Sequence, residues 1–147
     1  MNYSKDIEKL TESFEGVRLR AYQDSGGKWT IGYGHTDNVY PTQVITALEA
    51  ILMLECDLQK VAEHITGLIR IPVSQNEFDA ICDFAFNVGV EAFRYSTLLK
   101  LLNFSKIPAA AHEFERWDEV RGKVVAGLLK RRIAEENLFN ADEENAA

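Results

Sequence analysis

The chain has 147 residues, 46% of them hydrophobic and 27% charged, with a formal net charge of −7. This length suits one domain that buries its core without disulfides, and the composition excludes a disordered chain. No apolar run reaches the roughly 20 residues that a membrane span needs, and charges occupy residues 1–6 where a signal peptide would be apolar. We therefore expect no export signal and accumulation in the cytoplasm.

The first 45 residues predict a helix followed by a small hairpin. Residues 4–14 have Ser4 as a candidate cap and apolar residues at helical spacing. Residues 17–22 alternate like a strand, residues 24–27 read as a turn, and residues 28–33 resume the extended pattern. Asp37, Asn38 and Pro41 mark a loop over residues 36–45.

From Thr46 onward the pattern is almost entirely helical. Capping boxes at residues 46–49 and 74–77 open two helices, one running to about Gly67 and the other stopping at Gly89. Shorter helices are expected near Ser96, at Pro108 and after Gly127. In the long helix, one face is predicted to contain Leu48, Ile51, Leu58 and Ile65.

These elements predict an α+β fold in a single domain, residues 1–147. A small hairpin lobe (about 14–45) and a larger helical lobe (about 68–140, packed with helix 4–14) are joined by a linking helix (about 46–67). The small, acidic tail, residues 141–147, is expected to be disordered. A cleft between two such lobes is a natural site for an extended substrate.

Charge, cysteine and histidine usage narrow the function further. The acidity argues against general nucleic-acid binding, but residues 116–132 hold six bases and two acids and could face an anionic polymer. Cys56 and Cys82 lie in apolar helical patterns, which predicts two buried, reduced thiols. The three histidines are far apart and form no ligand motif. We expect no metal site and no cofactor.

Two carboxyl groups in the first lobe have the arrangement that glycoside hydrolysis needs. Glu15 ends the first helix and Asp24 lies at the hairpin turn, so the pair could flank a glycosidic bond. Apolar surface near Phe14 would keep Glu15 protonated, while turn amides would keep Asp24 ionised. With 23 acids in the chain, however, this pair alone is weak evidence, because an acid at a turn is routine.

The surrounding residues are more specific. Residues 14–24, followed by Trp29-Thr30-Ile31-Gly32-Tyr33-Gly34-His35-Thr36, closely resemble the phage-type lysozyme (endolysin) family. The family's pattern is Glu, eight residues, Asp, five residues, Thr, and then a Gly-x-Gly-His strand end, and this chain matches each position. Residues 75–80, 84–89, 96–99 and 127–135 resemble the family's helical lobe. The resemblance implies a lysozyme-like fold.

By that resemblance, Glu15 is the general acid and Asp24 orients or activates the attacking water. Thr30 resembles the third catalytic position. Its hydroxyl has too high a pKa to act alone, so it is expected to hold the water or to hydrogen-bond Asp24. His35 resembles a structural histidine.

Substrate contacts are less determined by sequence. Gly32 either marks a strand bulge or lets backbone approach a ligand. Phe86 and Asn87 are either a core aromatic and a helix-end polar residue or, by the resemblance, part of the cleft. Arg131 or Arg132 could contact Glu15 or anionic peptide stems; sequence does not decide which faces inward. Tyr33 lies between the two strand-end glycines and is also a candidate, whereas Trp29 and Trp117 are expected to pack.

The family resemblance implies an inverting muramidase that cleaves the β-1,4 bond between N-acetylmuramic acid and N-acetylglucosamine in bacterial peptidoglycan. It also implies a monomer that lyses the host cell from its cytoplasm, reaching the periplasm and wall through a holin. Two other interpretations stay open: a lytic transglycosylase, in which one Glu acts alone, and a non-catalytic glycan-binding domain.

Overall fold

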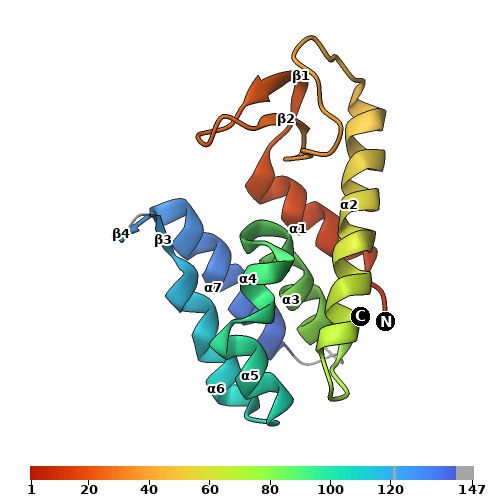
Figure 1. The fold of residues 1–147 in the computed structure, drawn as a ribbon. Helices are drawn as coiled ribbons and strands as arrows, with labels where there is room; N and C mark the ends of the chain where they lie inside the picture. Colours follow the sequence, from red (N-terminus) through yellow and green to blue (C-terminus); the bar gives the residue numbers. More distant parts are fainter. Residues whose placement is uncertain (121, 142–147) are drawn as a thin grey trace.

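The computed structural model describes residues 1–120 and 122–141. The long helix α2 (Ala47–Leu68) runs beside two lobes. Figure 1 shows the hairpin β1 (Arg18–Gln23) and β2 (Trp29–Gly32) at one end of α2 and the remaining helices around its other end. Helix α1 (Lys5–Glu15) leads from the helical lobe into the hairpin, so its last residue lies where the lobes meet. The α+β architecture predicted from sequence is confirmed.

The helical lobe follows α2 in chain order. It contains α3 (Gln75–Val88), α4 (Val90–Arg94), α5 (Thr97–Asn103), α6 (Ile107–Glu113), the 3₁₀ helix η1 (Phe114–Trp117) and α7 (Ala126–Asn140). A short antiparallel hairpin, β3 (Glu119–Val120) and β4 (Lys123–Val124), precedes α7 and was not predicted. Two-residue strands are too short to show an alternating pattern.

Both predicted capping boxes are confirmed. Thr46 accepts from the Glu49 amide at 3.1 Å, and Glu49 accepts in return from the Thr46 amide at 3.2 Å. Ser74 and Glu77 form the same reciprocal pair at the start of α3. Ser4 occupies the N-cap of α1, but its side chain makes no cap bond and instead donates to the Asp79 carboxylate. It therefore joins α1 to α3 rather than capping α1.

Each lobe has its own hydrophobic core. The small-lobe core is formed by Ala21, Ile31, Ile45 and Ala50, the last of these on α2. The helical-lobe core surrounds α3, where Phe84 packs edge-to-face against Phe93, Phe114 and Trp117. Tyr33 packs against both cores and so helps to couple the lobes. Trp29 packs against the small-lobe core, and both tryptophans therefore have the packing role expected of them.

Two sequence expectations about α2 were wrong in part. Its buried face contains Leu58 and Ile65, as predicted, together with Ala50, Leu54 and Ala62, whereas Leu48 is 65% exposed. Cys56 is exposed, although Cys82 is buried as predicted. Both errors have one cause. Apolar residues spread over a wider arc of α2 than the face that the lobes cover, so the apolar pattern does not determine which of these residues are buried.

The C-terminal prediction lies mostly outside the described residues, since only Ala141 of the tail is among them. Within the described residues, none of the helices has both the length and the apolar character that crossing a membrane requires. No group of histidine, cysteine and carboxylate side chains in this part of the chain is arranged to hold a metal ion.

Candidate active site

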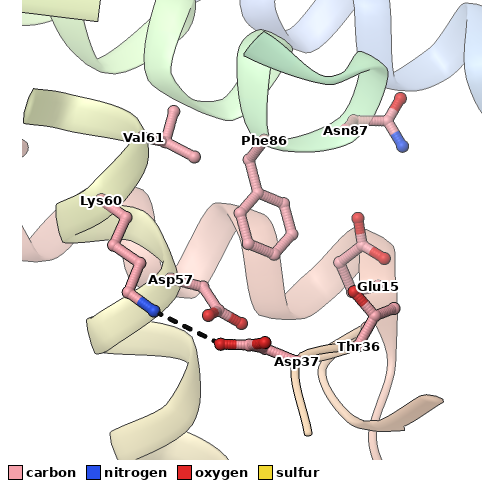
Figure 2. Close-up of a pocket in the computed structure, with 9 residues that line it drawn as sticks. Glu15, Thr36, Asp37, Asp57, Lys60, Val61, Phe86 and Asn87 are labelled. Carbon is pink, nitrogen blue, oxygen red and sulfur yellow. Dashed lines mark ion pairs between the residues drawn. The ribbon is translucent and has the colours of Figure 1, made fainter. Parts of the chain in front are cut away.

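A cavity of about 340 Å³ opens where the two lobes meet. Its walls come from the end of α1, the loop after β2, the middle of α2 and the end of α3 (Figure 2). Three carboxylates line it, and the full lining is Glu15, Gly34, Thr36, Asp37, Asp57, Lys60, Val61, Phe86 and Asn87. This lining of polar groups beside one aromatic ring suits a sugar, which presents hydroxyl groups and an apolar ring face.

Glu15 reaches the cavity because α1 ends there. Gly16 has a φ of 66°, a left-handed conformation that glycine adopts without strain, and it turns the chain from α1 into β1. The Glu15 side chain is 20% exposed. Its Oε1 accepts a 2.6 Å hydrogen bond from Nη1 of Arg131.

Arg131 is itself fixed by a buried carboxylate. Its Nε and Nη2 donate to the two oxygens of Asp83 at 2.9 and 2.8 Å, a bidentate pair. Thr11 of α1 donates to the same carboxylate at 2.7 Å. The side chain of Asp83 is 0% exposed and that of Arg131 is 4% exposed. Glu15 is therefore positioned through a chain of side chains from α3 and α7.

The charges in this cluster are strongly coupled. Burial opposes ionisation of Asp83, but hydrogen bonds from the Glu135 and Arg131 side chains outweigh it and lower the pKa of Asp83 to about 2. Burial, followed by the neighbouring Asp83, raises the pKa of Glu135 well above its usual range. Asp83 is thus the ionised partner that compensates the buried Arg131 charge.

Gly34 permits the loop after β2 to approach Glu15. Its φ is 78°, and a Cβ built on it would lie 3.2 Å from Oε2 of Glu15. Any side chain here would be strained by the backbone and would press on the Glu15 carboxyl group. This close approach is a physical reason for glycine at the position.

Asp24 is held by local backbone amides. Its Oδ1 accepts from the amides of Gly26 and Lys28, both at 2.9 Å. Thr30 is 4% exposed and donates to the carbonyl of Lys28 at 2.9 Å, so Lys28 links the two predicted catalytic residues. Among the described residues, Oδ2 of Asp24 makes no hydrogen bond and can accept one from a water molecule.

Comparison with known proteins identifies the family. The family model "Phage lysozyme" matches residues 12–135. The chain belongs to the phage lysozyme family. It is 44% identical to the endolysin of Acyrthosiphon pisum secondary endosymbiont phage 1, over 90% of this chain and 93% of that protein. It is 46% identical to the endolysin of Bacillus phage PZA over 90% of this chain, but it spans only 52% of that longer relative.

A solved structure supports the same relationship. The muramidase domain of SpmX from Asticaccaulis excentricus superposes with a TM-score of 0.90 and 37% identity, covering 96% of this chain and 99% of that domain. Family membership makes this phage lysozyme a glycoside hydrolase of the muramidase type, with peptidoglycan as its class of substrate.

The loop after β2 is tied to α2 at the edge of the cavity. Nδ1 of His35, predicted to be structural, lies 2.7 Å from Oδ2 of Asp57, and Nε2 lies 2.9 Å from the Asp37 carbonyl. Lys60 pairs with Asp37 at 3.8 Å, the contact drawn in Figure 2. These contacts fix one lip of the cavity to the long helix.

The predicted substrate-binding residues divide into two groups. Phe86 and Asn87 line the cavity, and Figure 2 shows both extending from the end of α3 on the side opposite Glu15 and Thr36. Gly32 and Tyr33 instead pack inward, with a Cβ on Gly32 placed 3.5 Å from the side chains of Ala50 and Ile45. The structure brings the first pair to the cavity and the second pair to the core.

The structure also separates the two arginines. Arg131 contacts Glu15, whereas Arg132 is 0% exposed, pairs with Glu135 at 2.6 Å and lies over the Phe84 ring. The predicted contact of Arg132 with substrate is therefore not supported by its position. Its guanidinium belongs to the interior of the helical lobe because successive residues on a helix point about 100° apart.

Sequence reasoning missed Asp83, Asp57 and Lys60. Asp83 had a usable signal: it interrupts the apolar run 80–86 in a helix, and a charge in such a position requires a buried partner. Asp57 and Lys60 are ordinary charges on a long helix, and only the packing of the lobes brings them to the cavity. No local pattern distinguishes them from solvated residues.

Proposed function

We propose that this phage lysozyme hydrolyses the β-1,4 bond between N-acetylmuramic acid and N-acetylglucosamine, with Glu15 as the general acid. The observation that carries the proposal is the placement of the Glu15 carboxyl group at the cavity between the lobes, held by Arg131. A carboxyl group at this point can protonate the oxygen that leaves the anomeric carbon.

The proposed reaction needs a second group on the other side of the sugar. Asp24, through its free Oδ2, takes a proton from a water molecule as the water oxygen bonds to the anomeric carbon. The bond from that carbon to the leaving oxygen breaks, and the leaving oxygen takes the proton of Glu15. Thr30 supports this step by holding the strand end beside Asp24 through Lys28.

Attack by water from the face opposite the leaving group inverts the anomeric carbon. We therefore expect the first-formed sugar to be the α anomer. NMR of a fresh digest, recorded before mutarotation, tests this expectation. A β anomer at the earliest time points would instead indicate a covalent glycosyl-enzyme intermediate.

Mass spectrometry of the digest tests the reaction class. Hydrolysis adds one water for each bond cleaved and leaves reducing ends. A lytic transglycosylase would leave anhydro ends, lighter by one water, because the sugar's own hydroxyl group closes the ring. Anhydro products from the wild-type enzyme would contradict the proposed roles of Asp24 and water.

We further propose that the enzyme acts as a monomer in lysis of the host cell and depends on a holin to reach the wall from the cytoplasm. Expression alone should leave cells intact, and co-expression of a holin should lyse them. Lysis without a pore-forming partner would contradict this dependence, and sedimentation equilibrium checks the monomer.

A further inference from the structure

A second cavity lies on the helical lobe, away from the hairpin. Its volume is about 420 Å³, and it is lined by Gly67, Leu68, Arg70, Arg94, Leu99, Lys100, Asn103 and Phe104. These residues come from the end of α2, the segment after it, α4, and α5 with the residue that follows it. Figure 1 shows α5 and the end of α2 toward the opposite end of the molecule from β1 and β2. It shares no lining residue with the cavity at Glu15.

The charge of this second cavity is opposite to that of the catalytic cavity. Three cations and no carboxylate line it, whereas three carboxylates line the cavity at Glu15. Residues 94–106 contain three bases and no acid in a chain whose net charge is −7. Among the described residues, Arg70 and Lys100 form no ion pair, and Arg94 pairs only with the exposed Glu91 on its own helix. The cavity therefore presents unneutralised positive charge.

The walls of the cavity are held in place by one side-chain amide. Asn103 at the end of α5 donates to the Leu68 carbonyl at 3.1 Å and accepts from the Arg70 amide at 2.8 Å. These two bonds connect α5, which carries Lys100, to the end of α2 and the backbone of Arg70, so the segments that bear the two cations are joined before any ligand arrives. A preorganised site loses less conformational entropy on binding.

An exposed aromatic ring completes the rim. Phe104 is 77% exposed, and within the described part of the chain no large hydrophobic side chain is more exposed. The turn that presents it contains Ser105 with a φ of 59°, an uncommon conformation for a residue with a Cβ. Leu68 and Leu99 add apolar surface to the lining. A ligand that combines a carboxylate with an apolar body fits these surfaces.

We propose that this cavity binds the acidic peptide stems of peptidoglycan at a point outside the catalytic cavity. The inference rests on the proposed function, because the stems belong to the proposed substrate. The polymer carries stem carboxylates at regular intervals, so a second site on the same molecule raises the effective concentration of glycan at the catalytic cavity. A cavity lined by three cations favours a single carboxylate group over the flat surface of a membrane.

Co-sedimentation with purified, insoluble peptidoglycan tests the proposal. In a Glu15→Gln background, which prevents digestion, Arg70→Glu/Lys100→Glu is expected to raise the apparent Kd about tenfold at low salt. The matched control is Lys5→Glu/Lys9→Glu, which changes the net charge equally through two exposed lysines of α1. Equal binding by the two double variants would overturn the proposal, whether both weaken binding through net charge or neither does.

Chemical amidation of the stem carboxylates gives an independent test of the proposal. It should reduce binding of the Glu15→Gln protein to the level of the Arg70→Glu/Lys100→Glu variant and should affect that variant little. Unchanged binding of the parent protein to amidated polymer would overturn the proposal. Binding to phosphatidylglycerol vesicles is measured in parallel. If the Arg70→Glu/Lys100→Glu variant kept full binding to the polymer but lost binding to the vesicles, the second cavity would be a membrane site and the proposal would be overturned.

Two checks keep these outcomes interpretable. Circular dichroism melting confirms folding, and if the charge reversals unfold the protein, Arg70→Gln/Lys100→Gln is expected to give about a threefold effect in its place. Cleavage of a short, soluble, stem-free glycan by the Arg70 and Lys100 variants, with Glu15 intact, should change less than about twofold. Failure of the binding test with intact wild-type hydrolysis refutes only the second site.

Discussion

Glu15 and Asp24 are held in place by opposite means. Glu15 is positioned by Arg131, whose own place is fixed by the buried Asp83, so its support comes from residues distant in sequence. Asp24 is positioned by amides of its own turn, at Gly26 and Lys28. This difference predicts that changes around Glu15 affect stability and activity together, whereas changes at Asp24 affect activity with little loss of stability.

Of the substitutions that test this difference, at Asp24, Arg131, Asp83 and Gly34, Asp24→Asn should have the largest effect on activity. The asparagine Oδ1 can still accept both turn amides, so the free energy of unfolding should change by less than about 1 kcal/mol. Loss of the carboxylate base should lower the rate of peptidoglycan cleavage about 100- to 10,000-fold. Initial rates and urea unfolding measure the two quantities. A large loss of stability would show that Asp24 is mainly structural.

Arg131→Ala should reduce both the free energy of unfolding and the rate of peptidoglycan cleavage. It leaves the buried Asp83 without its guanidinium, which costs about 3–5 kcal/mol of stability, and it frees Glu15, which should slow cleavage about 100-fold. Arg116→Ala is the matched control, because the side chain of Arg116 is 77% exposed in its 3.3 Å pair with Glu113. That change should cost less than about 1 kcal/mol. Similar losses from the two variants would refute the positioning role.

Asp83→Asn should change how stability depends on pH. Since the pKa of Asp83 falls from 3.8 to about 2 on folding, the ionised group stabilises the fold above about pH 4, and this stabilisation is lost as the pH falls towards 2. The shift corresponds to about 2 kcal/mol at neutral pH. The variant should therefore be less stable at neutral pH and lose less stability between pH 4 and pH 2, as urea unfolding at several pH values can show.

Gly34→Ala should have a smaller effect that is specific to the site. The new Cβ, 3.2 Å from Oε2 of Glu15, should displace the carboxyl group and lower activity about tenfold. Gly122→Ala is the matched control because Gly122 has the same φ of 78° and open space around it. Both changes should cost about 1–2 kcal/mol through backbone strain. Equal activities of the two variants would show that contact with Glu15 is unimportant.

The same division between local and distant support explains what sequence could predict. The capping boxes of α2 and α3 were found because all their partners lie within four residues, and the Glu15, Asp24 and Thr30 pattern was found because it spans one short segment. The choice between Arg131 and Arg132 could not be made, because it depends on how α7 packs against α3 and α1. Cys56 was misplaced for the related reason that the lobes cover only part of α2.

The most direct measurement of the central claim compares wild type with Glu15→Gln on purified peptidoglycan. Glutamine keeps the size of the side chain and can retain a hydrogen bond from Arg131, but it cannot donate a proton to the leaving oxygen. Release of reducing ends should fall at least about 100-fold while the melting temperature stays within a few degrees. A folded variant that cleaves peptidoglycan at the wild-type rate would show that Glu15 is not the proton donor.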